Sequence, residues 1–137
     1  MAHVYDSIRQ YIAVGSVNLS SATLKASLVN TLANAASGYV FSAAHTMLSD
    51  VPAVAIQATG TLANVAVSSG RVKADDLAIG SGTGGNINAV ILYVATANSS
   101  TSPLIFIQSE GTGFPLTPDG GTINVIWENS DPFILKV

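Results

Sequence analysis

The stretch Asn88-Ala89-Val90-Ile91-Leu92-Tyr93-Val94-Ala95-Thr96 is the longest apolar run in the chain. It is rich in β-branched and aromatic residues, which pack well on a pleated sheet. Turn-forming residues flank it: a glycine-rich segment precedes it, and Asn98-Ser99-Ser100-Thr101-Ser102-Pro103 follows it. Periodicity alone does not distinguish a buried strand from a buried helix in so short a run. The composition and the flanking turns favour a strand that is buried on both faces.

A second apolar strand, Leu-Ile-Phe-Ile-Gln, is predicted at residues 104–108. The connection is too long for a two-residue hairpin but suits a wider loop. We therefore expect residues 89–93 and 104–107 to form a core hairpin. No charged residue occurs from position 87 to position 107, which is a long span for the polar outer face of a monomer. We expect a second copy of the chain to cover part of this neighbourhood.

Residues 23–32 show the period-two alternation of a half-exposed strand. Leu24, Ala26 and Leu28 would face one side, and Thr23, Lys25, Ser27 and Val29 would face the other.

The next part of the chain predicts a loop and a short turn. An alanine-rich loop follows position 32, and Tyr39-Val40-Phe41 could insert into the core as an anchor. Residues 45–52 predict a turn or a one-turn helix, with Ser49 or Asp50 as its cap.

Further strands are predicted along the rest of the chain. Residues 54–67 predict a strand that is interrupted at Gly60, and Ser68-Ser69-Gly70 predicts a turn. Residues 71–79 predict a strand that is broken at Asp75-Asp76. Residues 122–128 predict a strand with Ile123, Val125 and Trp127 on one side, and residues 133–137 predict a strand at a sheet edge. Residues 80–85 and 110–121 predict loops, because they are rich in glycine or in glycine, proline and aspartate.

Residues 2–14 predict the only helix of any length, because Val4, Ile8, Tyr11 and Ile12 fall on one stripe at the helical period. Asp6 suits the first turn, and Gly15 suits the end of the helix. Two interpretations stay open: a helix that covers the sheet, or an arm that reaches a neighbouring subunit.

The predicted fold is mainly β: an antiparallel β-sandwich or barrel of about seven to eight strands with a short N-terminal α-helix. One domain fits the length of 137 residues. Residues 1–15 would be the helix or arm, and residues 16–137 the sandwich.

Charged residues are 9% of the chain, against about 25% in ordinary soluble domains. Such a surface is weakly protected against self-association. The net charge of −3 and the scattered cations argue against nucleic acid, which requires clustered positive charge. There is no cysteine, so disulfides and thiolate metal sites are excluded. We expect no signal peptide, because the first residues carry Asp6 and Arg9 within a mixture of polar and apolar residues. We expect no membrane span, because no stretch reaches the roughly 20 apolar residues that one needs.

The residues offer little chemistry. Glycines 80–85 precede a strand instead of a helix, and no lysine follows until Lys136, so they do not form a phosphate-binding loop. His45 and Asp50 with Ser42 or Ser49 are triad residue types, but their spacing matches no nucleophile motif. Two histidines are too few for a multi-histidine metal site within one chain. The sequence predicts no enzyme, no catalytic residue, no cofactor and no metal.

Seven short motifs occur in an order that resembles a group of small structural proteins of tailed bacteriophages. They include "Thr-Leu-Lys-x-x-Leu-Val", "His-x-x-Leu-Ser-Asp-Val-Pro" and "Gly-Gly-x-Ile-x-Val-x-Trp". The motifs lie at residues 5–15, 23–29, 45–52, 89–93, 102–107, 120–127 and 134–136. The chain departs from this pattern at residues 33–44, which are rich in alanine instead of polar and acidic residues.

The resemblance implies a non-enzymatic virion protein, and first of all a capsid decoration or cement protein. Such a protein is made in the host bacterial cytoplasm, binds the lattice of the major capsid protein as a homo-oligomer, with a trimer favoured, and stabilises the head without nucleic acid or membrane. Candidate contacts with the capsid or with another subunit are Val4, Tyr5, Ile8, Tyr11, Gly82, Gly84, Phe114 and Pro115.

Two other classes stay open. One is a tail, neck or fibre-associated protein of the same virion. The other is a carbohydrate-binding β-sandwich, which requires exposed aromatic residues beside carboxylates, and only 7% of this chain is aromatic.

Overall fold

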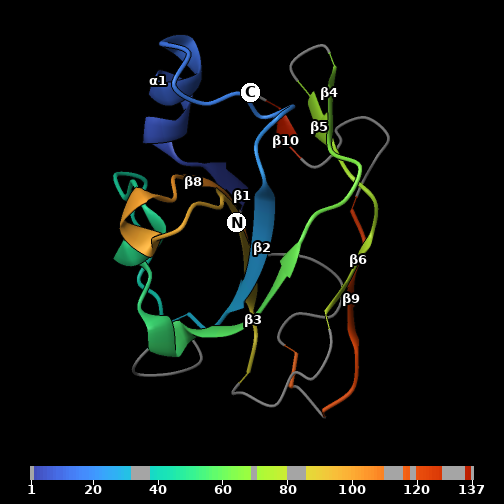
Figure 1. The fold of residues 1–137 in the computed structure, drawn as a ribbon. Coiled ribbons are helices and arrows are strands. Elements are labelled where there is room, and N and C mark those ends of the chain that lie inside the picture. The colour runs from blue at the N-terminus through green and yellow to red at the C-terminus, as the bar shows by residue number, and fades with distance from the viewer. Residues whose placement is uncertain are drawn as a thin grey trace.

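A five-stranded antiparallel sheet is the centre of the computed structural model, which describes residues 2–31, 38–68, 71–79, 86–109, 116–117, 120–127 and 135–136. The strand order is β1-β8-β7-β2-β3. Two smaller sheets lie on one side of it, and short 3₁₀ turns lie on the other (Figure 1). The fold is mainly β with one short N-terminal helix, as predicted.

Strand β7 (Ala89–Val94) is the middle strand, and all six of its residues are buried. It pairs with β2 (Leu24–Val29) on one side and with β8 (Leu104–Gln108) on the other. The predicted core hairpin is confirmed. The side chains of β7 alternate between two cores: Val90, Leu92 and Val94 belong to the larger one, the main core, and Ala89, Ile91 and Tyr93 belong to the other.

A bulge in β8 joins the hairpin to the N-terminus. Leu92 lies opposite Phe106 and Tyr93 opposite Leu104, so Ile105 is the extra residue. The Ile105 carbonyl accepts a hydrogen bond of 3.0 Å from the Tyr5 amide. The bulge thus fixes the point at which the N-terminal segment leaves the sheet.

The predicted start of the N-terminal helix is wrong. Residues Ala2–Val4 form strand β1, which pairs with β8, and helix α1 runs only from Asp6 to Ala13. The apolar stripe did not distinguish the strand from the helix, because Val4 packs against the core from a strand as it would from a helix. Gly15 has a φ of 79° and follows the end of the helix, as predicted.

The prediction that β2 is half-exposed is also wrong. Ser27 and Val29, which were placed on the exposed face, are completely buried. Residues 39–56 return over this face and bring Tyr39, Val51 and Ala55 against it. Phe41 packs against the same core while Val40 is exposed, so two residues of the predicted anchor insert.

The predicted turn at residues 45–52 is confirmed as a 3₁₀ turn, Leu48–Asp50. The Asp50 carboxylate accepts hydrogen bonds from the amides of Thr46 at 2.9 Å and Met47 at 3.2 Å. Asp50 therefore caps the turn. A second 3₁₀ turn, Ala53–Ala55, leads into the next strand, and a third, Ser99–Thr101, lies in the β7–β8 connection.

Strand β3 (Ile56–Thr61) continues through Gly60, which was predicted to interrupt it. The glycine serves packing instead: a Cβ there would lie 2.9 Å from Cγ1 of Ile79 and 3.0 Å from a methyl carbon of Leu77. The chain leaves the strand after Thr61 and adopts a positive φ of 54° at Asn64.

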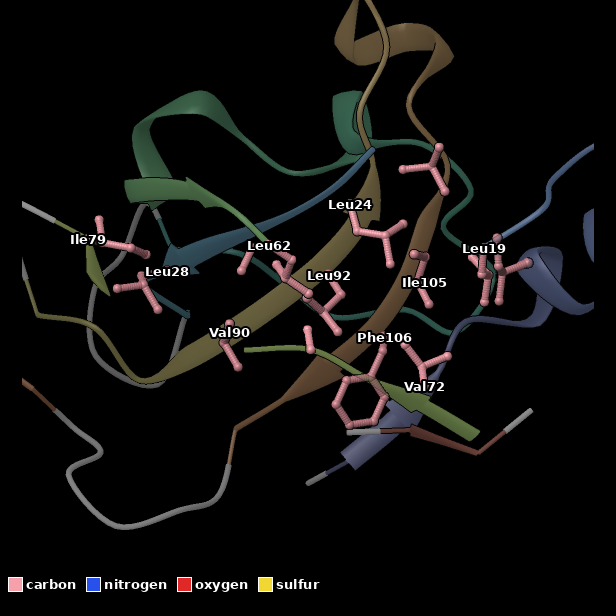
Figure 2. Packing of buried hydrophobic residues seen from close by; sticks show 14 of the residues in the cluster. Leu19, Leu24, Leu28, Leu62, Val72, Ile79, Val90, Leu92, Ile105 and Phe106 are labelled. Atoms are coloured by element: carbon pink, nitrogen blue, oxygen red, sulfur yellow. The ribbon is translucent and has the colours of Figure 1, made fainter. Parts of the chain in front are cut away.

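The second layer consists of short strands: β4 (Ala66–Ser68), β5 (Arg71–Lys73), β6 (Leu77–Ile79), β9 (Ile123–Val125) and β10 (Leu135–Lys136). They form the sheets β10-β5-β4 and β6-β9. The acidic break at Asp75-Asp76 separates β5 from β6, as predicted. Figure 2 shows Val72 and Ile79 of this layer in one cluster with Leu28, Val90 and Leu92 of the main sheet.

The described residues contain ten strands, more than the seven or eight predicted, because all five second-layer strands have only two or three residues. Residues 80–85 and most of the loop at 110–121 lie outside the described part of the chain. Within the described ranges, no helix has the length and apolar character needed to cross a membrane.

Candidate functional site

Both histidines of the chain lie in one aromatic cluster, which consists of His3, Tyr5, Tyr39, Phe41 and His45. The ring centroids of His3 and Phe41 are 5.3 Å apart, those of Tyr5 and Phe41 5.7 Å, and those of Tyr39 and His45 5.5 Å. Strand β1 supplies His3, the next residue but one along the chain is Tyr5 at the start of helix α1, and the segment after Gly38 supplies the other three rings. The aromatic cluster therefore joins the N-terminus to the segment that covers β2.

A chain of hydrogen bonds runs through the aromatic cluster. The hydroxyls of Tyr5 and Tyr39 share a bond of 2.9 Å, and the Tyr39 hydroxyl lies 2.7 Å from Nδ1 of His45. Burial raises the pKa of both phenols above the usual value. Both tyrosines therefore stay neutral at pH 7, and their hydroxyls satisfy one another inside the protein.

The triad residue types do not assemble into a triad. The ring of His45 is bonded to Tyr39, and the Asp50 carboxylate is bonded to the amides of its own turn. Those amide bonds, that of Thr46 first, lower the pKa of Asp50. The Ser42 hydroxyl accepts a bond from the Ala44 amide, and Ser49 is exposed. Among the described residues no serine hydroxyl is bonded to the ring of His45.

The acidic pair Asp75 and Asp76 has a structural role. The side-chain amide of Asn64 donates to Asp75, and the Trp127 amide donates to Asp76 at 3.0 Å. Trp127 packs against the main core together with Ile123 and Val125, which the sequence placed on the same side. No group of three or more histidines and acidic residues that could hold a metal ion occurs within the described ranges.

The structure changes the set of candidate contact residues. Tyr5 and Ile8 are completely buried within their own chain, so neither can contact a capsid or another subunit in this fold. Ile8 belongs to the apolar stripe of the predicted helix, and that stripe faces the main core, whereas Tyr5 lies in the other core. Val4 and Tyr11 are partly buried against the main core. Gly82, Gly84, Phe114 and Pro115 lie outside the described residues.

Exposed aliphatic side chains are a surface feature that the sequence did not single out. Four of them are more than half exposed: Val14, Val40, Val54 and Ile126, at 61%, 59%, 68% and 77%. Val54 lies in the second 3₁₀ turn, and Ile126 directly follows β9 in the second layer. Both flanks of the main sheet therefore present uncharged apolar side chains to solvent.

Comparison with known proteins identifies no relative: no protein family and no curated protein matches this chain.

Proposed function

We propose that this chain is a non-enzymatic structural protein of a tailed-phage virion, and that it decorates the capsid by binding the lattice of the major capsid protein. The motifs that resemble small phage structural proteins supply the first support. They coincide with the elements that build the fold: the segment at residues 45–52 is the capped turn, residues 89–93 lie in β7, and residues 120–127 contain β9.

The exposed aliphatic side chains are the observation that carries this proposal. A decoration protein needs a stable scaffold that presents uncharged surface to another protein. Here a fully buried β7 supplies the scaffold, and the exposed Val54 and Ile126 lie on opposite sides of the main sheet. Because isolated surface hydrophobics are common in monomers, the argument depends on their combination with a chain that is only 9% charged.

The proposed mechanism is adhesive. A homo-oligomer, with a trimer favoured by the resemblance, engages several capsid subunits at once, so that weak individual contacts add up. The head gains stability by mass action, because the protein binds the assembled shell and not its separate parts. The N-terminal segment has a structural part in this scheme. Strand β1 is paired with β8 of its own chain and is not a free arm.

Co-sedimentation with expanded capsids tests the proposal. Purified wild-type protein should pellet with the capsids, saturate at hundreds of copies per particle, and raise the temperature at which the heads break open. Val54→Glu and Ile126→Glu place the same charge on opposite sides of the main sheet. Each variant is therefore the control for the other. The variant whose charge lies on the side that contacts the capsid should bind capsids at least about tenfold more weakly than the wild type, which corresponds to about 1.4 kcal/mol of binding free energy.

Three results would contradict a decoration role. The first is a wild type that does not pellet with capsids at micromolar concentration. The second is binding at only about a dozen sites per particle, as a neck or tail protein does. The third is reproducible binding to glycans and none to capsids, which would favour the carbohydrate-binding class.

A further inference from the structure

The two outer edges of the main sheet differ in how they are protected. On one side, β1 has three residues and leads directly into helix α1. On the other side, β3 has six residues with the sequence Ile-Gln-Ala-Thr-Gly-Thr. Natural edge strands are usually short or carry charge or proline, which prevents pairing with another chain. Strand β3 is uncharged and contains no proline, and its one bulge, at Gln57 between the partners of Leu28 and Val29, leaves residues 58–61 in regular register.

The register of β3 shows which backbone groups face outward. The Leu62 amide donates to the Leu24 carbonyl at 2.9 Å, and Gly60 lies opposite Ala26. Because inward and outward residues alternate along an antiparallel strand, Gly60 directs its backbone groups toward β2, and Thr59 and Thr61 direct theirs away from it. Among the described strands, only β2 pairs with β3.

We propose that β3 pairs antiparallel with β3 of a second copy of this chain, across a two-fold axis at Gly60. In this register Thr59 lies opposite Thr61 of the second copy, and Thr61 lies opposite its Thr59. Each such pair exchanges two backbone hydrogen bonds. The two five-stranded sheets then form one continuous sheet.

Self-complementarity identifies the second copy as the occupant. When β3 is reversed on itself about Gly60, threonine meets threonine, which is a favourable cross-strand pair, and no charged residue meets a like charge. Gly60 lies on the axis in a non-hydrogen-bonded pair, where the Cα atoms approach to about 4.5 Å. A two-fold contact of this kind is isologous and closes at two copies.

This pairing goes beyond the proposed capsid role and does not depend on it. It predicts a dimer in solution, whereas the phage resemblance favours a trimer. The measurement that separates the two is the mass of the purified protein by light scattering or sedimentation equilibrium. We expect a dimer at micromolar concentration.

Charge reversal tests the strand directly. Thr59 and Thr61 are both exposed, so Thr59→Lys/Thr61→Lys and Thr59→Glu/Thr61→Glu should each fold, at a stability lowered equally in both by the loss of the bond between the hydroxyls of Thr59 and the buried Ser27. Each double variant sets like charges opposite one another, and the dissociation constant of its dimer should rise at least about tenfold. An equal mixture of the two should restore dimers, because opposite charges then face each other. Thr122→Lys/Asn124→Lys adds the same charge at exposed sites, one just before β9 and one within it, and its dimer should have the dissociation constant of the wild type.

Circular dichroism checks that each variant is folded. A wild-type monomer at every concentration would overturn the proposal, and so would a dimer or trimer that both double variants retain. If the wild type is a monomer and the lysine variant loses capsid binding, β3 receives a strand of the capsid protein, and the second copy is the wrong occupant.

Discussion

Val90→Asp places a carboxyl group in the most protected strand of the protein. Val90 is 4% exposed, belongs to the main core, and lies between Leu28 of β2 and Gln108 of β8. Loss of the buried valine costs about 1.5–3 kcal/mol. A carboxyl group that stays protonated there at pH 7 costs about 4 kcal/mol, because roughly three pH units at 1.36 kcal/mol each separate pH 7 from the ordinary Asp pKa.

A buried carboxyl group without a hydrogen-bond partner adds about 1–3 kcal/mol. The sum of about 7–10 kcal/mol is comparable with the whole free energy of unfolding of a typical domain, about 5–15 kcal/mol. We therefore expect Val90→Asp not to fold at pH 7. The measurement is urea unfolding followed by circular dichroism and by the fluorescence of Trp127, the single tryptophan.

Val90→Asn is the matched control, since it has the shape of Asp and no charge. Burial raises the pKa of the new Asp in the folded state, so its penalty begins near the unfolded-state pKa of about 4 and grows as the pH rises. Relative to Val90→Asn, the Asp variant should regain about 4 kcal/mol between pH 7 and pH 4. A Val90→Asp protein that is folded at pH 7 and within about 2 kcal/mol of Val90→Asn would refute the central position of β7.

Two further substitutions test the segment that covers β2. Tyr39→Phe leaves the hydroxyl of the fully buried Tyr5 without its partner, so it should cost about 1–3 kcal/mol in urea unfolding. The double variant with Tyr5→Phe should be no less stable than Tyr39→Phe, and simple additivity would contradict the shared hydrogen bond. Asp50→Ala removes a cap and should cost about 1 kcal/mol at pH 7. The pKa of Asp50 is lowered in the folded state, so this stabilisation should be present above about pH 4 and disappear as the pH falls below it; a difference from wild type that persists at pH 2 would contradict the cap.

The strands that the sequence predicted best are those whose environment is the same on both faces. The run in β7 is apolar at every position, so it is buried whichever way each side chain points. The bulge at Ile105 could not be predicted, because it depends on how the N-terminal segment meets β8. Local pattern therefore identified the hairpin, and tertiary contacts determined its register.

The two wrong predictions, a half-exposed β2 and a helix that begins at residue 2, also result from tertiary contacts. Ser27 appears polar and exposed in the alternation of β2, but residues 39–56 cover it and its hydroxyl bonds to Thr59. Val4 fits a helical stripe, but β8 offers it a sheet edge to pair with. Each error arises where a segment distant in sequence determines the environment of a residue.

The aromatic cluster was only half predictable. The anchor at Tyr39 and Phe41 follows from aromatic residues after an alanine-rich loop. Its partner Tyr5 is 34 positions earlier in the chain, and no spacing rule connects the two. The exposed valines and isoleucine could not be predicted from the sequence either, because only the folded chain shows which apolar residues lie outside the cores.

The most direct test of the proposed function is an image reconstruction of the virion that carries this protein. The account predicts density that fits the two-layered fold at regularly repeated positions on the outer surface of the capsid lattice, in hundreds of copies. Density for the chain only at the neck, tail or fibres, or no density on the particle, would contradict it.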